Sequence, residues 1–166
     1  IAAQPIAFAA AVTVVDTEQP WSEELVEPEL VMMQHGACVQ GIRAYVQKFG
    51  FQKVVIGLSG GIDSALVATL AVDALGADNV TGIGMPSSYS SGHSVSDAEQ
   101  LANNLGITFH NLSIAPLQEA FAAVLEPVFA GTEAGLAEEN LQSRARGVLL
   151  MAFANKHGNL LLTTGN

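Results

Sequence analysis

The stretch GLSGGIDS, residues 57–64, follows the apolar run Val54–Ile56 and precedes a segment of helical character. A short β-branched run in which apolar and polar residues do not alternate is typical of a strand buried on both faces of a sheet. The order of strand, glycine-rich loop and helix allows two interpretations. Residues 57–61 fit the pattern G-x-S-x-G, which presents a nucleophilic serine, here Ser59. The whole stretch also fits a cradle for phosphate.

Strands and helices alternate along the rest of the chain. We expect strands over 53–58, 80–85, 107–112 and 160–163, and helices over 28–49, 63–75, 96–105, 116–129 and 138–156. We also expect Ser96 and Glu99 to form a capping box at the start of their helix. Pro127 is expected to kink or end its own helix. The alternation predicts an α/β domain whose parallel sheet carries helices on both faces.

Ligands of such sheets bind outside the carboxyl ends of the strands. Three loops are expected to meet at that edge, namely 59–63, 86–93 and the residues from 164 onward. The glycine-rich stretch belongs to the first of these loops. The sequence therefore predicts a ligand site around it.

The composition bounds the class of protein. With 166 residues, 49% of them apolar, the chain is long enough for one domain with a core, and it has no apolar run long enough to span a membrane. A formal charge of −10 with six Lys and Arg argues against a nucleic-acid-binding protein. It does not exclude nucleotides, because Mg²⁺ can bridge an acidic protein and a polyphosphate. The single cysteine, Cys38, excludes an internal disulfide, indicates a reducing, cytoplasmic setting, and is expected to pack in the core.

The serine hydrolase interpretation is the less favoured of the two. It requires an acid and then a histidine later in the chain, and His93, His110 and His157 are available. His110 alternates within a predicted strand, and His157 ends a predicted helix, where the helix dipole already explains a histidine. The serine would also follow the first strand of the sheet, whereas several strands come first in α/β-hydrolases. Labelling of Ser59 by a fluorophosphonate would restore this interpretation.

The phosphate cradle explains every residue type in the loop. Gly60 and Gly61 can adopt backbone angles closed to other residues and let phosphate approach the chain. Their N–H groups, with those that open the next helix, point at an anion, and Ser59 and Ser64 add hydroxyl donors. Asp63 fits beside phosphates if its carboxylate holds Mg²⁺. The G-K-[ST] ending of a Walker A motif is absent.

The order S-G-G-x-D-S at 59–64 resembles the signature of the ATP pyrophosphatases, which split ATP between its α- and β-phosphates. That group includes GMP synthetases, asparagine synthetases, tRNA-thiolating enzymes and NAD synthetases. Three further stretches resemble the glutamine-dependent NAD synthetases in particular. They are MPSSYSS at 85–91, ENLQSRARG at 139–147 and LTTGN at 162–166, and their order and spacing agree with that family across 28–166.

The resemblance implies a Rossmann-like fold of the adenine nucleotide alpha hydrolase type. It also implies a cytoplasmic ligase that amidates deamido-NAD at the expense of ATP. The nicotinate carboxylate would attack the α-phosphate, pyrophosphate would leave, and ammonia would then displace AMP to give NAD. The ammonia would come from glutamine through a separate domain, or free from solution. A homodimer or larger homo-oligomer is also implied, and another ATP pyrophosphatase such as a GMP synthetase is the alternative within the group.

The resemblance also implies roles for individual residues. The residues expected to bind ATP are Gly57, Leu58, Ser59, Gly60, Gly61, Ile62, Asp63, Ser64 and Thr164, with Asp63 holding Mg²⁺. Asn140 and Arg144 are expected to bind deamido-NAD from one face of a helix. Arg146 lies off that face and is expected to be structural, so that Arg144 alone would meet the ligand charges. Weaker candidates are Ser87, Ser90 and His93.

The domain organisation is predicted in two parts. Residues 1–21, with the apolar run 6–15, are expected to be a linker or the end of a preceding glutaminase domain, and 22–166 the ATP-binding synthetase domain. The Lys-Ser-Glu segment of the family would follow Asn166. We therefore expect a piece of a longer protein that is inactive by itself. A non-catalytic ATP-binding module is the alternative from another class.

Overall fold

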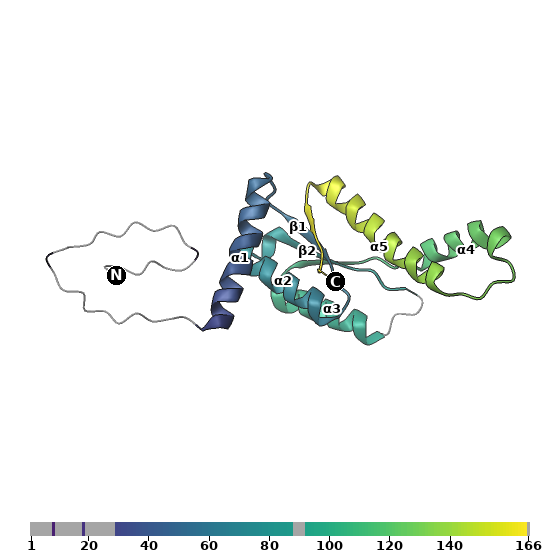
Figure 1. Ribbon diagram of the computed structural model, residues 1–166, viewed down its shortest axis with the longest axis horizontal. Helices are drawn as coiled ribbons and strands as arrows, with labels where there is room; N and C mark the ends of the chain where they lie inside the picture. Colours follow the sequence, from purple (N-terminus) through teal and green to yellow (C-terminus); the bar gives the residue numbers. More distant parts are fainter. Residues whose placement is uncertain (1–7, 9–17, 19–28, 88–91, 166) are drawn as a thin grey trace.

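The computed structural model describes residues 8, 18, 29–87 and 92–165 (Figure 1). In this part of the chain the strands are β1 Val54–Gly57, β2 Val80–Gly84, β3 Thr108–Asn111 and β4 Leu160–Leu162. The helices are α1 Leu30–Lys48, α2 Ile62–Leu75, α3 Gly92–Leu105, α4 Ala115–Phe129 and α5 Leu136–His157, with a 3₁₀ turn, η1, at Ala77–Asn79. The strands form a parallel sheet in the order β3-β2-β1-β4. The predicted α/β fold with a parallel sheet is therefore confirmed.

Strand β1 lies inside the sheet and pairs with β2 on one side and β4 on the other. From β1 the chain proceeds outward through β2 and β3, and it then returns to place β4 on the opposite side of β1. This reversal of strand order is a topological switch point, where open α/β sheets leave a crevice at their carboxyl edge. The loops after β1 and β4 therefore lie side by side.

Two hydrophobic clusters lie on opposite faces of the sheet. One face of β1 presents Val54 and Ile56 to α1, α2 and α3, whose small buried residues Ala68 and Ala102 allow close approach. The other face presents Val55, which packs against α5 together with residues at the end of β2. Figure 1 shows the same division, with α1, α2 and α3 on one side of the sheet and α5 on the other. Helix α4 packs beside α5 and buries none of its own residues.

Element ends agree with the sequence prediction to within about four residues, and one local expectation was wrong. Helix α3 begins at Gly92, so Ser96 lies inside it. Its hydroxyl donates to the His93 carbonyl at 2.9 Å, one turn back, and it does not form the expected capping box with Glu99. Pro127 lies inside α4, which ends two residues later at Phe129.

The prediction that Cys38 packs in the core was also wrong, because its side chain is exposed. Helix α1 contacts the domain mainly through its second half, where Val46 is buried and Ile42 packs on the core. Leu30 and Met33 in its first half are 70% and 42% exposed. None of the described helices combines the length and apolarity needed to cross a membrane. The predicted linker and strand within 1–21 lie outside the described residues, apart from residues 8 and 18.

Candidate active site

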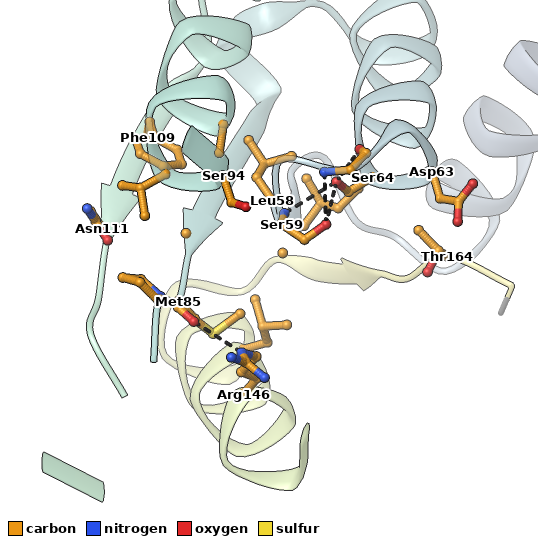
Figure 2. A pocket seen from close by; sticks show the side chains of 18 of the residues that line it. Leu58, Ser59, Asp63, Ser64, Met85, Ser94, Phe109, Asn111, Arg146 and Thr164 are labelled. Atoms are coloured by element: carbon orange, nitrogen blue, oxygen red, sulfur yellow. Dashed lines mark hydrogen bonds between the residues drawn. The ribbon is translucent and has the colours of Figure 1, made fainter. Parts of the chain in front are cut away.

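A cavity of about 530 Å³ lies at the carboxyl edge of the sheet (Figure 2). The ends of all four described strands contribute to its wall, and the first turns of α2 and α3 and the middle of α5 complete it. Of the residues predicted to bind ATP, those that line the cavity are Gly57, Leu58, Ser59, Gly61, Asp63, Ser64 and Thr164. The structure therefore brings together the loop after β1 and the residue after β4, as the switch point requires.

The loop can only pass α3 because position 60 is glycine. Gly60 has a φ of +79°, in the left-handed region that side chains disfavour. A Cβ atom there would lie 2.9 Å from the Ser94 Cα and would meet the Ser94 carbonyl oxygen. Both the backbone conformation and the available space therefore demand glycine. Gly60 shapes the cradle without itself lining the cavity.

Hydrogen bonds inside the loop fix its shape. The Ser64 hydroxyl donates to the Gly61 carbonyl at 2.9 Å and accepts from the Ser59 N–H at 3.3 Å. The Ser59 hydroxyl lies 3.2 Å from that of Ser64 and accepts from the Gly61 N–H at 3.2 Å. Leu58 N–H, just before the loop, donates to the Ile83 carbonyl of β2 at 2.9 Å. The buried Ser64 thus joins the loop to the helix that follows it.

This network leaves Ser59 without a base. Its hydroxyl is engaged by Ser64 and Gly61, and no histidine is found among the described residues that line the cavity. The ring of His110 packs at 5.6 Å from Phe153, and His157 packs at 4.3 Å from the same ring. His93 is exposed on α3. The geometry therefore does not support the serine hydrolase interpretation.

The start of α2 faces the loop and supplies unpaired donors. The first backbone bond of this helix runs from Ala65 N–H to the Gly61 carbonyl at 3.1 Å. The N–H groups of Ile62, Asp63 and Ser64 precede it and have no partner within the helix. Such a helix start favours anions, both through these donors and through the helix dipole. The side chain of Asp63 lies at the open side of the loop, toward Thr164 (Figure 2).

The two residues expected to bind deamido-NAD do not line the cavity. Asn140 and Arg144 are both exposed, on the half of α5 that packs beside α4. The Arg144 Nη1 donates to the Asn140 carbonyl at 3.2 Å, so this guanidinium bonds along its own helix. The two residues do share one helix face, as the spacing predicted. That face does not contribute to the cavity that the glycine-rich loop lines.

Arg146, for which the sequence predicts a structural role, lines the cavity. Its Nε donates to the Met85 carbonyl at 3.1 Å, and burial lowers the pKa of its guanidinium below the ordinary value. Its placement differs from that of Arg144, and which of the two arginines meets the ligand charges stays a prediction. A signal for this placement was present in the sequence, because Arg146 precedes the buried Leu150 by one turn and Ala154 by two.

Several lining residues carried no motif that sequence reasoning could use. Phe109 and Asn111 come from β3, and Ser94 and Val95 from the first turns of α3. Their common signal is position alone, at the carboxyl end of a strand or the start of the following helix. Among the weaker candidates, Ser87 and His93 do not line the cavity, and Ser90 lies outside the described residues.

A parallel sheet with a glycine-rich loop, an unpaired helix start and an acid at its switch point defines a nucleotide-binding α/β protein. Comparison with known proteins narrows this class. The family model described as NAD synthase matches residues 35–166. The chain therefore belongs to the NAD synthase family, and the family predicted from the sequence motifs is confirmed.

Relatives and solved structures agree with this assignment. The chain is 51% identical over 157 residues to the glutamine-dependent NAD(+) synthetase of Synechocystis, a match that covers 95% of this chain and 26% of that protein. It resembles the structure of the Acinetobacter baumannii enzyme in complex with adenosine diphosphate, with a TM-score of 0.83, 46% identity, and coverage of 87% of this chain and 27% of the other. The NH3-dependent NAD synthetase of Campylobacter jejuni, complexed with nitrate, gives a TM-score of 0.71 at 31% identity, with coverage of 80% and 55%. The chain spans about a quarter of the length of the curated relatives that it matches.

Proposed function

We propose that this chain provides the ATP site of an enzyme that amidates deamido-NAD to NAD. The carboxylate of deamido-NAD attacks the α-phosphate of ATP, pyrophosphate leaves, and ammonia then displaces AMP from the acyl-adenylate. A carboxylate is a poor electrophile, and adenylation supplies a good leaving group. The protein's contribution is chiefly to position the reactants and stabilise developing charge.

The loop from Gly57 to Ser64 is the observation that carries this proposal. Its hydroxyls and glycines are fixed by internal hydrogen bonds, so the donors of Ile62, Asp63 and Ser64 are held in place before any ligand arrives. Donors that need no reorganisation are the most effective at stabilising phosphate charge. Thr164, beside the loop across the β1–β4 pair, supplies a further hydroxyl to the nucleotide.

Mg²⁺ fits the same site. It prefers oxygen ligands and is commonly held by one or two carboxylates together with substrate phosphates. Asp63 is the only acid among the described residues that line the cavity, and it is exposed. The described residues hold no group of three or more His, Cys, Asp or Glu side chains that could bind an ion by themselves. Asp63 would hold the ion, which would neutralise charge on the phosphates and take most of its other ligands from them and from water.

Asn140 and Arg144 would bind deamido-NAD outside the cavity described here. Their shared, exposed face offers an amide and a guanidinium to a dinucleotide, which carries phosphates and a carboxylate. A homo-oligomer would place further surface beside this face. Both assignments, like the cytoplasmic setting and the ammonia source, remain predictions.

The test has two readouts. Binding of ATP with Mg²⁺ to this chain is measured by titration calorimetry, and pyrophosphate release is then measured with deamido-NAD and ammonium. Pyrophosphate release that requires deamido-NAD, with repeated turnover that also requires ammonium, supports the amidation. Release without deamido-NAD, or no binding of ATP by a folded chain, contradicts the proposal.

A second candidate is a non-catalytic ATP-binding module. The separation of Asn140 and Arg144 from the cavity favours it for this chain in isolation, because the ATP loop is assembled while the expected dinucleotide contacts are not directed into the same space. Binding of ATP without pyrophosphate release would support this candidate.

A further inference from the structure

Arg146 lies on the stripe of α5 that faces the sheet. It precedes Leu150 by one helical turn and Ala154 by two, and both of these residues are buried against β1 and β2. Its side chain therefore enters the cavity from the α5 wall. Figure 2 shows Arg146 beside Met85, on the opposite side of the pocket from the loop that carries Ser59 and Ser64.

One hydrogen bond orients the guanidinium of Arg146. The Nε donates to the Met85 carbonyl at 3.1 Å, and Met85 directly follows β2. A bond at Nε fixes the plane of the group and leaves Nη1 and Nη2 at its outer end. Within the described residues, the structure gives these two nitrogens no acceptor. Two parallel donors are therefore held ready at the cavity wall.

No carboxylate of the described residues forms an ion pair with Arg146. Arg146 is the only cation and Asp63 the only acid among the described lining residues, and the one ion pair in the described part of the chain joins His35 to Asp73. Burial lowers the pKa of Arg146, which reflects partial loss of hydration around its charge. A partly buried cation without a counter-ion gains from a bound oxyanion, and arginine binds phosphate or carboxylate through two parallel bonds.

We propose that Arg146 is an oxyanion-binding residue of this cavity. Met85 holds its Nε, and Nη1 and Nη2 bind a phosphate or carboxylate group of a ligand that also contacts the glycine-rich loop. The inference rests on the proposed function, because ATP and deamido-NAD both carry such groups. It names Arg146, beyond the residues that the family motifs indicated, as the cation that meets them.

Arginine-selective modification by phenylglyoxal, mapped by mass spectrometry, tests the proposal on the unaltered chain. Arg144 serves as an internal control for ATP, because it lies two residues away and does not line the cavity. ATP with Mg²⁺ at about ten times its Kd is expected to slow modification of Arg146 by about tenfold, because only the unliganded fraction then reacts, and to leave Arg144 unchanged. Adenosine should protect neither residue. Protection by deamido-NAD alone would assign the oxyanion to the dinucleotide instead of ATP.

Two variants distinguish oxyanion binding by Arg146 from a purely structural hydrogen bond to the Met85 carbonyl. Arg146→Lys keeps the charge, whereas Arg146→Gln keeps a donor for the Met85 carbonyl and loses the charge. Arg146→Gln should lower ATP affinity by about tenfold with adenosine affinity unchanged, and Arg146→Lys should retain more of the ATP affinity. Equal ATP affinity in the parent and Arg146→Gln, or no protection of Arg146 by either nucleotide, would overturn the inference. Protection without pyrophosphate release would favour the non-catalytic ATP-binding module for this chain and leave the inference standing.

Discussion

The glycine-rich loop at 57–64 and the helical segment at 139–147 carry equally recognisable motifs. The structure brings the residues of the first motif together at one site but divides those of the second. The loop lies between β1 and α2, and its serines, glycines and helix start are tied together within eight residues. The helical segment divides its polar residues between two directions. Arg146 enters the cavity, whereas Asn140 and Arg144 remain exposed beside α4. A motif whose contacts are local can be completed by one short segment, but a motif spread along a helix depends on what packs against each face.

Gly60→Val should have the largest effect, because it disrupts the local motif. Valine would be strained at a φ of +79°, by about 1–3 kcal/mol, and its Cβ would meet Ser94 at a further cost of about 1–3 kcal/mol. We expect a lower midpoint in urea unfolding and loss of ATP binding. Gly147→Ala is the control in the helical segment, where a Cβ would meet nothing within 4 Å, and it should gain up to about 1 kcal/mol. Equal stability of the parent and Gly60→Val would show that the loop is free to rearrange.

Asp63→Asn should have the next largest effect, confined to binding. Asp63 is exposed, and its loss should change the free energy of unfolding by less than about 1 kcal/mol through the helix dipole. Affinity for ATP with Mg²⁺ should fall by about 10–100-fold, the range of a lost charged contact. Affinity for ATP without Mg²⁺ should be unchanged or improved, because a like charge is removed. Asp78→Asn, an exposed acid in η1, is the control and should change neither affinity.

Arg144→Met tests the second region and should have a smaller effect than Asp63→Asn. The side chain is exposed and bonds along its own helix, so unfolding should change by less than about 0.5 kcal/mol. Affinity for deamido-NAD should fall by about tenfold while ATP affinity stays the same, as measured by titration calorimetry with each ligand. Equal loss for both ligands would mean that the two regions form one continuous site in solution.

Glu138→Gln should have the smallest effect, limited to the start of α5. The Glu138 carboxylate accepts a hydrogen bond from the Gly135 N–H at 2.6 Å, and this backbone bond lowers the pKa of Glu138. A lowered pKa means that the ionised form supports the helix start above the unfolded value of about 4.3, and that this support is lost as the pH falls through the folded value. Hydrogen exchange at Gly135 should therefore accelerate in acid relative to Glu138→Gln, which keeps an acceptor but does not titrate. Identical pH dependence in both chains would contradict this account.

The sequence predicted most of the fold, because its signals are short-range. Buried strands without alternation, glycines after helices and the loop at 57–64 all fix structure within a few residues. Prediction from the sequence failed where packing between residues far apart in the chain determines the position of a side chain. Cys38 was placed in the core because its neighbours are apolar, but the half of α1 that carries it does not pack on the sheet. Arg146 was judged by its spacing from Asn140, whereas its spacing from Leu150 shows which way it points.

The residues of the candidate site also fall into two groups, those that a local motif could place and those that it could not. The residues around Ser59 could be placed from one motif, since their hydrogen bonds are made within the loop. The β3 residues Phe109 and Asn111 could not, because only the strand order brings them to the cavity. Position in a sheet is a property of the whole domain and leaves little trace in a short stretch of sequence.

The most direct test of the account is calorimetric titration of ATP into the parent chain and Asp63→Asn, each with and without Mg²⁺. The account predicts that Mg²⁺ strengthens binding to the parent and has little effect on the variant, so that the two chains differ by about 10–100-fold only when the ion is present. Equal affinities of the two chains under both conditions would show that Asp63 does not hold the ion beside the ATP phosphates, and would contradict the central claim.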